Sequence, residues 1–118
     1  MIGFNNSTPS PLTSLDVSDN SFTGSIGSDI SQLSGLAYFY LMHNMITGPI
    51  PSSLAALSQM KYLVMHNNVL TGTIHDFNNQ SLLQYFDVYS NSLTGTVYYG
   101  DTITFFVGHY AMHIFDIY

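Results

Sequence analysis

The sequence predicts a mostly-β solenoid of the α/β repeat type, built from four repeats of 23–24 residues. One phrase ending in Thr-Gly recurs four times, and every copy carries an asparagine four residues before the glycine. These asparagines lie 24, 24 and 23 residues apart, at Asn20, Asn44, Asn68 and Asn91. A fixed period of this size is typical of stacked units that cannot bury their apolar side alone.

A short alternation of apolar residues precedes each asparagine. The alternating pairs are Leu15/Val17, Phe39/Leu41, Leu63/Met65 and Phe86/Val88. A period of two predicts a short strand with one buried face. Successive strands would then stack as a parallel sheet, with a spacing of about 4.8 Å.

The residues after each strand are suited to a turn and a return to the core. An asparagine amide both donates and accepts, so stacked asparagines can satisfy backbone groups in the turn. The glycine of each phrase permits a tight bend. The apolar residues that follow are expected to re-enter the core: Ile26, Ile50, Ile74 and Val97.

In general form the repeat reads L-x-x-L-x-L-x-x-N-x-L-T-G-x-I, and the second repeat carries it most completely, from Leu36 through Pro51 to Leu57. This pattern, between Pro11 and Val97, resembles the leucine-rich repeat, and its T-G-x-I-P ending resembles the plant-type subclass of extracellular receptors and inhibitors. The resemblance implies a curved solenoid with a parallel sheet on its concave face, where ligands usually bind. Members of this subclass commonly carry cysteine-bearing caps, and this chain has no cysteine.

Composition excludes several function classes. The chain of 118 residues is one domain by length, with 46% hydrophobic residues available for a core. Its formal net charge is −6, from seven Asp and a single lysine, Lys61. Nucleic-acid binding and attachment to an anionic membrane both require cationic groups, so neither is expected. Any membrane association would have to come from parts not present here.

The N-terminal residues and three asparagine motifs bear on whether the protein is secreted. No signal peptide is visible at Met1. Ile2 precedes Leu12 by ten residues, as Ile26 precedes Leu36, so residues 1–10 are expected to end a preceding partial repeat of a longer protein. Three asparagines match the N-glycosylation pattern, Asn5, Asn6 and Asn79. The resemblance to extracellular receptors and inhibitors, with which these matches are consistent, implies an extracellular or cell-surface location.

The pattern changes after residue 97. Residues 98–118 are rich in aromatic residues and lack Lys and Arg. The stretch from Ile103 to Val107 favours a strand that covers the last repeat as a cap. An uncharged aromatic strand edge could instead associate with another chain. Polar residues such as His109 and Asp116 interrupt the tail, which disfavours a membrane span of about 20 apolar residues.

Aligning the four strands predicts columns of side chains on the exposed face of the sheet. Residues outside the buried set have no packing reason to be aromatic, and tyrosine suits binding because it joins a flat apolar face to a polar tip. The predicted ligand contacts are Asp16, Tyr40, Met42, His43, Val64, His66, Asp87 and Tyr89. The tyrosines just before each strand core, Tyr38, Tyr62 and Tyr85, are expected mainly to stabilise the sheet by packing between strands.

No catalytic or metal centre is predicted. His43 and His66 lie in neighbouring repeats and could approach each other, but only Asp19 is an obvious third ligand, whereas metal sites normally use three or four. No serine lies in a G-x-S-x-G elbow, and no phosphate-binding loop is present. We expect neither a cofactor nor an enzyme.

The sequence thus favours a non-catalytic extracellular recognition module that binds a peptide, protein or glycan. The alternative is a structural protein that assembles head-to-tail into a filament, because an uncapped solenoid exposes an apolar face at each end. A third reading is a truncated or imperfectly inferred chain whose tail does not naturally continue the repeats.

Overall fold

Two parallel sheets form the body of the protein. The computed structural model describes residues 11–75, 77, 80–97, 104–106 and 112–114. Within these residues the first sheet has the order β1-β2-β4-β6-β8 and the second has the order β3-β5-β7-β9. The strands of the first sheet are β1 (Ser14–Asp16), β2 (Tyr38–Tyr40), β4 (Tyr62–Val64), β6 (Tyr85–Asp87) and β8 (Thr104–Phe106). Those of the second are β3 (Thr47–Pro49), β5 (Val69–Thr73), β7 (Ser92–Val97) and β9 (Met112–Ile114).

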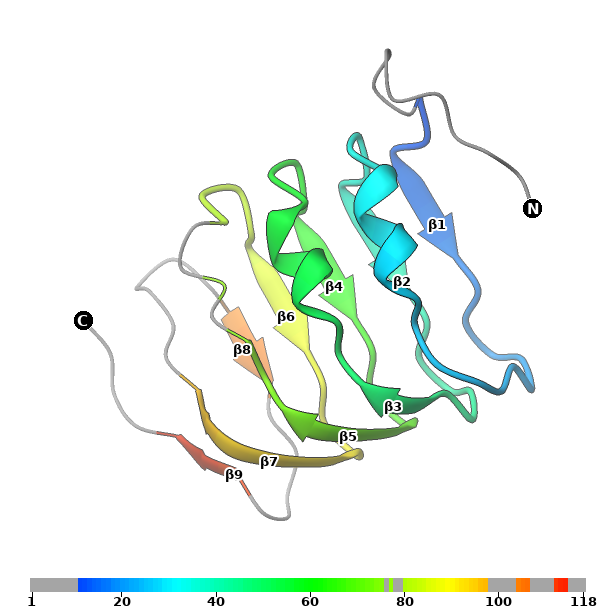
Figure 1. Ribbon diagram of the computed structural model, residues 1–118, viewed down its shortest axis with the longest axis vertical. Coiled ribbons are helices and arrows are strands. Elements are labelled where there is room, and N and C mark those ends of the chain that lie inside the picture. Colours follow the sequence, from blue (N-terminus) through cyan, green and yellow to red (C-terminus); the bar gives the residue numbers. More distant parts are fainter. Residues whose placement is uncertain (1–10, 76, 78–79, 98–103, 107–111, 115–118) are drawn as a thin grey trace.

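The first sheet follows the repeat alignment residue for residue. Tyr38 pairs with Ser14 and with Tyr62, and Tyr62 pairs with Tyr85. The predicted columns of this sheet are therefore confirmed. One repeat supplies one strand, so equivalent side chains of successive repeats lie side by side (Figure 1).

The second sheet pairs out of phase with the repeats. Repeat alignment would place Thr47 opposite Thr71, but Thr47 pairs with Val69 and Thr71 pairs with Ser92. Each strand is thus displaced by two residues relative to its neighbour. A displacement of two keeps every side chain on its own face of the sheet, so the apolar residues still point inward.

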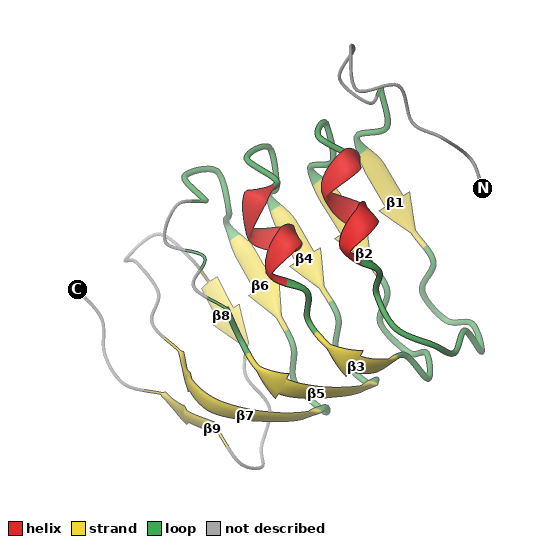
Figure 2. Cartoon of the chain, in the orientation of Figure 1, coloured by secondary structure: helices red, strands yellow, loops and turns green. Residues whose placement is uncertain are grey.

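Two short 3₁₀ helices cover one face of the first sheet (Figure 2). They are η1 (Ser28–Gln32) and η2 (Ser52–Ala56), each in the looser stretch between the Thr-Gly phrase and the next strand. The core lies between these helices and the two sheets. Its most deeply buried residues, at 0% exposure, include Leu36, Ile50, Leu54, Met60, Leu63, Met65, Leu70 and Phe86. The predicted alternation and the return of Ile50 and Ile74 to the core are confirmed.

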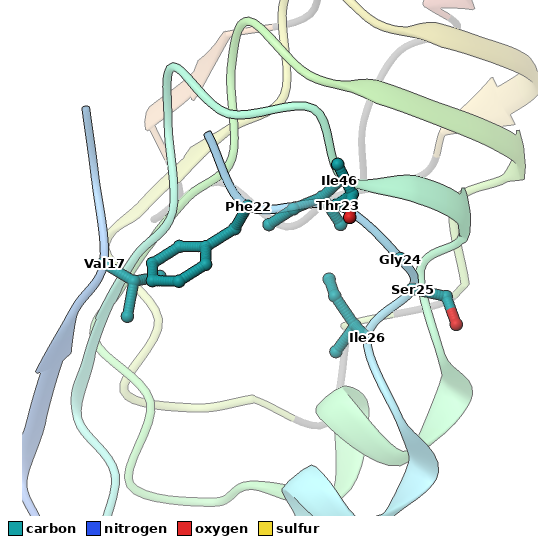
Figure 3. Close-up of a pocket in the computed structure, with 7 residues that line it drawn as sticks. All are labelled: Val17, Phe22, Thr23, Gly24, Ser25, Ile26 and Ile46. Atoms are coloured by element: carbon teal, nitrogen blue, oxygen red, sulfur yellow. The ribbon is translucent and has the colours of Figure 1, made fainter. Parts of the chain in front are cut away.

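The first described repeat is less well covered than those that follow. Leu15 and Val17 are only partly buried, whereas their equivalents Phe39 and Leu41 are 4% and 1% exposed. Beside them, Phe22 is 51% exposed at an opening of about 270 Å³. Figure 3 shows the Phe22 ring extending toward Val17, with Ile26 on the other side of the opening.

The aromatic tail contributes to both sheets. The strand predicted around residues 103–107 is confirmed as β8, which pairs in parallel with β6. β9 pairs in the same way with β7. Strand pairing therefore continues beyond residue 97, where the sequence repeat ends. The cap and association roles predicted for residues 98–118 stay predictions.

A ladder of asparagines links the turns of neighbouring repeats. The side-chain nitrogen of Asn68 donates to the carbonyl oxygens of Leu41 in the previous repeat, at 2.9 Å, and Met65 in its own, at 3.2 Å. Its side-chain oxygen accepts from the backbone N–H of Ile46 at 3.0 Å. Asn44 and Asn91 make the same set of bonds one repeat away in each direction. The predicted role of the asparagines is confirmed.

The residue before each ladder asparagine has a left-handed backbone. The φ angles are 54° at Asp19, 55° at His43, 54° at Asn67 and 52° at Ser90. Asn, Asp and His tolerate this region better than most residues, which accounts for three of the four residue types. The glycine of each phrase also has a positive φ, from 80° to 97°. At Gly95 an added Cβ would come within 3.0 Å of Thr73, so both φ and space favour glycine there.

Gln80 occupies a core position that leucine fills in the other repeats. The backbone N–H of Leu83 donates to the carbonyl of Gln80, as Met60 donates to Leu57 and Leu36 to Leu33. Gln80 is only 4% exposed, and its Nε2 donates to the carbonyl oxygen of Leu54 at 2.9 Å. Its Oε1 is buried without a hydrogen-bond partner. This amide is therefore an incompletely satisfied polar group in the core.

Substitution of Asn68 by Ala should lower the free energy of unfolding by about 2–4 kcal/mol, because it leaves the buried backbone N–H of Ile46 without a partner and removes one of the two amide donors from each of the carbonyls of Leu41 and Met65. Asn20→Ala is the matched control: Asn20 is exposed and bonds only to carbonyls of its own repeat, Val17 and Ser18. We expect a loss of about 1 kcal/mol or less for this variant. Urea unfolding followed by circular dichroism measures both. An equal decrease in the free energy of unfolding for both variants would contradict the conclusion that the asparagine ladder stabilises the contact between repeats.

Substitution of Gln80 by Leu should raise the free energy of unfolding by about 1 kcal/mol, because it removes the unpartnered Oε1. The Leu54 carbonyl keeps the backbone N–H of Leu57 as a donor, so the change leaves no new unpaired group. The reverse change at the equivalent position, Leu57→Gln, should destabilise the protein. Thermal unfolding of the three proteins provides the test, and a lower stability for Gln80→Leu would show that the amide contributes a favourable bond.

Candidate functional site

The candidate site is the face of the first sheet that points away from the core. Side chains alternate along each strand, so the neighbours of the buried Phe39, Leu63 and Phe86 project to the opposite face. On β2, β4 and β6 these neighbours are Tyr38, Tyr40, Tyr62, Val64, Tyr85 and Asp87. The face is therefore mainly aromatic, and its turns add further rings.

Three tyrosines form a continuous row of ring contacts across this face, at the start of β2, β4 and β6. The ring centroids of Tyr38 and Tyr62 are 5.7 Å apart, and those of Tyr62 and Tyr85 are 5.6 Å apart with an interplanar angle of 20°. Such cross-strand aromatic contacts stabilise a sheet. The packing role that the sequence predicts for this column is confirmed.

A buried carboxylate, that of Asp87, lies at the end of β6 on this face. Asp87 is 3% exposed, and its Oδ2 lies 3.0 Å from Nδ1 of His66 and accepts from the hydroxyl of Tyr85 at 3.3 Å. Its Oδ1 accepts from the backbone N–H of Tyr89 at 3.3 Å. Burial, followed by the nearby Asp87 charge and hydrogen bond, raises the pKa of Tyr85 above 10.0. These bonds compensate the carboxylate for its loss of water.

Three rings gather beside this carboxylate, at the ends of the strands. The ring of His66 stacks on that of Tyr89, with centroids 4.4 Å apart and an interplanar angle of 11°. His43 meets His66 edge-on at 5.0 Å, so the predicted approach of the two histidines is confirmed. The Nδ1 of His43 is 3.2 Å from the side-chain nitrogen of Asn67. We refer to Tyr40, Met42, His43, His66 and Tyr89 as the central patch.

Val64 and Asp87 are predicted from the sequence to be exposed, and this prediction is wrong: the residues are 6% and 3% exposed. Val64 is short and lies in register between Tyr40 and Asp87, so the longer side chains around it exclude water. The side chain of Asp87 is kept in its buried position by its bonds to His66 and Tyr85. The two residues form the floor of the patch rather than its surface.

The other predicted contacts lie along the β1 side of the patch. Tyr40 is half-buried, and burial is the main reason that its pKa is raised above 10.0. Met42 is half-buried, and its sulfur accepts from the hydroxyl of Ser18 at 3.0 Å. Asp16 is exposed on β1, and the adjacent Ser18 lowers the pKa of its carboxyl below 3.8, through its hydroxyl when this turns from Met42 to Asp16 and through its backbone N–H, which donates to Oδ1 at 3.0 Å. Asp16 is thus an ionised group at the rim.

Sequence reasoning missed three residues that bond to residues of the predicted site: Ser18, Asn67 and Tyr85, which bond to Met42, His43 and Asp87 respectively. A signal for two of them was available. Tyr85 lies two residues before Asp87 on one strand, and alternate residues share a face. Asn67 lies one repeat after His43 in the same column. Ser18 differs, since only the structure shows its hydroxyl bonded to Met42.

Among the described residues, no group of three or more His, Cys, Asp or Glu side chains could hold a metal ion. The same part of the chain contains no helix of the length and apolarity that a bilayer crossing requires. The predicted glycosylation sites Asn5, Asn6 and Asn79 lie outside the described residues.

The chain was compared with known proteins. A family model described as "Leucine rich repeat" matches residues 10–70. No match was found among curated protein sequences. Among solved structures, the ectodomain of the plant membrane receptor kinase GASSHO1/SCHENGEN3 from Arabidopsis thaliana is 27% identical, with a TM-score of 0.74 over 86% of this chain. The Arabidopsis receptor kinase HAESA is 34% identical over 73% of this chain (TM-score 0.70), and the Arabidopsis thaliana BIR2 ectodomain is 33% identical over 75% (TM-score 0.72).

The chain spans only part of each of these proteins: 13% of the GASSHO1/SCHENGEN3 chain, 14% of the HAESA chain and 47% of the BIR2 chain. The matched family model covers more than half of the present sequence, and the two parallel sheets agree with the matched structures. The chain therefore belongs to the leucine-rich-repeat family, with repeats of the plant type.

Proposed function

We propose that this chain is a non-catalytic, extracellular recognition module that binds a peptide or a peptide segment of a protein on the outer face of its first sheet. The observation that carries the proposal is the central patch, a surface of aromatic, imidazole and thioether groups. Tyr89 is 36% exposed at the edge of this patch, although a packing role would favour burial. Rigid aromatic side chains provide contact area at a low cost in conformational entropy.

Two of the matched structures support a peptide ligand. The GASSHO1/SCHENGEN3 ectodomain was solved in complex with CASPARIAN STRIP INTEGRITY FACTOR 2, and HAESA in complex with the peptide hormone IDA and the co-receptor SERK1. Both proteins are plant receptor kinases, which also supports a location at the cell surface. A glycan ligand and glycosylation remain alternatives from the sequence alone.

The form of the patch also supports recognition. Its rings are held by contacts between repeats before any ligand arrives, as shown by the His66–Tyr89 stack at 4.4 Å. Preorganised side chains lose little freedom on binding, so more of the contact energy is retained as affinity. Val64 and Asp87 would support the floor, and Asp16 would contribute one negative charge at the rim.

Simultaneous substitution of Tyr40, His66 and Tyr89 by Ala should abolish capture of peptides from an immobilised peptide array. Removal of the central anchors of an interface is expected to lower the affinity for the peptide by about 100-fold or more. Because His66→Ala removes a partner of the buried Asp87, the double variant Tyr40→Ala, Tyr89→Ala should be measured as well. Circular dichroism must show that both variants remain folded.

The matched control replaces exposed apolar residues elsewhere, with Phe22→Ala and Leu82→Ala, which are 51% and 39% exposed in the native chain. We expect these variants to retain capture. Undiminished binding by the folded double variant would refute the assignment of the patch. Light scattering on the same samples tests the filament alternative, since regular fibres in place of a monomer would favour head-to-tail assembly.

A further inference from the structure

The two histidines of the central patch differ in what their ring nitrogens bond to. The Nδ1 of His66 faces a carboxylate oxygen of Asp87 at 3.0 Å, and a carboxylate can only accept. His66 must therefore carry its proton on Nδ1. In the neutral ring, Nε2 is then a hydrogen-bond acceptor.

His43 has the opposite arrangement. Its Nδ1 faces the side-chain nitrogen of Asn67 at 3.2 Å, and an amide nitrogen can only donate. The Nδ1 of His43 must therefore accept, which places the proton of the neutral ring on Nε2. Within the described part of the chain, neither Nε2 atom has a hydrogen-bond partner.

Neighbouring repeats hold both rings in place. Tyr89 stacks on His66 with an interplanar angle of 11°, and His43 meets the same ring at 90°. The backbone N–H of His43 donates to the carbonyl of His66 at 3.1 Å, and that of Asn67 donates to the carbonyl of Tyr89 at 3.1 Å. The exposed face thus carries one fixed donor and one fixed acceptor on rings whose centroids are 5.0 Å apart.

We propose that His43 and His66 are held in opposite tautomers and together recognise the backbone N–H and C=O of one residue in an extended peptide ligand. The inference rests on the proposed function and adds the chemistry of recognition. A residue in extended conformation presents its N–H and C=O to the same side, as in an antiparallel sheet. The Nε2 acceptor of His66 receives the ligand N–H, and the Nε2–H donor of His43 binds the ligand C=O.

This pairing distinguishes among ligand classes. A carboxylate ligand offers only acceptors and would face the Nε2 acceptor of neutral His66. A sugar hydroxyl both donates and accepts, so it can bond to either ring, and the positions of the donor on His43 and the acceptor on His66 do not select for it. A peptide residue has one of each, in a fixed direction.

Protonation should weaken recognition. A protonated imidazole has two donors and no acceptor. His66 would then lose the acceptor for the ligand N–H, and His43 would lose its bond from Asn67. Among the described residues, the charged and titratable groups on the same face are Asp87, Tyr85 and Tyr89 on the β6 side, Tyr38, Tyr40 and Tyr62 on β2 and β4, and Asp16 and Asp19 on the β1 side.

The tautomers can be tested without a ligand. Long-range ¹H–¹⁵N correlation spectra of the imidazoles at pH 8 should show His66 protonated on Nδ1 and His43 on Nε2. The variant Asn67→Asp replaces a donor by an acceptor and should move the His43 proton to Nδ1, while leaving His66 unchanged. Aspartate is tolerated there because Asp19 has the same left-handed backbone in the equivalent position, with φ 54° at both. The same tautomer on both native rings would overturn the proposal.

Recognition of the backbone requires a second experiment. The tightest eight-residue peptide from an array is remade with each amide changed in turn to an ester, which removes one N–H. One ester should weaken binding to the native chain at pH 8 by about tenfold, the effect of losing one well-placed hydrogen bond. The variant His66→Phe keeps an aromatic ring against Tyr89 but has no acceptor. It should therefore bind the ester peptide and the amide peptide with nearly equal affinity.

The outcomes separate this proposal from the proposed function. Capture of peptides with equal ester effects in the native chain and in His66→Phe would leave peptide recognition standing and overturn the histidine pair. Absence of peptide capture, or capture of neutral oligosaccharides instead, would overturn both. Binding that strengthens when the pH falls from 8 to 5 would likewise contradict an Nε2 acceptor.

Discussion

The bond network of the ladder asparagines is the interaction on which the rest of the structure depends. A repeat of this length must turn sharply after a strand of three residues, and that turn would leave backbone groups buried without partners. Asn44 and Asn68 each satisfy groups in their own repeat and in the one before. No repeat is therefore complete by itself, and stability is a property of neighbours, as expected for a solenoid.

The same turn builds the central patch. The left-handed residue before each asparagine, such as His43 or Asn67, redirects the chain and places its side chain in one column with its equivalents. Residues 23 or 24 apart in the sequence thus come into contact, and His43 lies against His66 and Asn67. The arrangement of the patch thus follows directly from the stacking of the repeats.

Asp87 is a buried carboxylate in a chain with few charged residues, and its hydrogen bonds organise the side chains around it. A buried carboxylate is costly unless it is hydrogen-bonded, and Asp87 has partners in His66, Tyr85 and the backbone of Tyr89. The carboxylate in turn determines which nitrogen of His66 carries the proton. Gln80 is the contrasting case: its Nε2 donates to the carbonyl of Leu54, but its Oε1 is buried without a hydrogen-bond partner. The contrast between Asp87 and Gln80 shows that burial of a polar side chain does not by itself define a site.

The sequence by itself determined the period, the alignment of the first sheet, the buried alternation and the role of the asparagines, because these depend on spacing that recurs in every repeat. It also identified most residues of the patch, since side chains excluded from the core must lie on the other face. Only the tertiary structure decided the burial of Val64 and Asp87, the displacement of the second sheet by two residues, and the partners of the two histidine rings. These features depend on the size and polarity of side chains in adjacent repeats, and periodicity carries no information about such contacts.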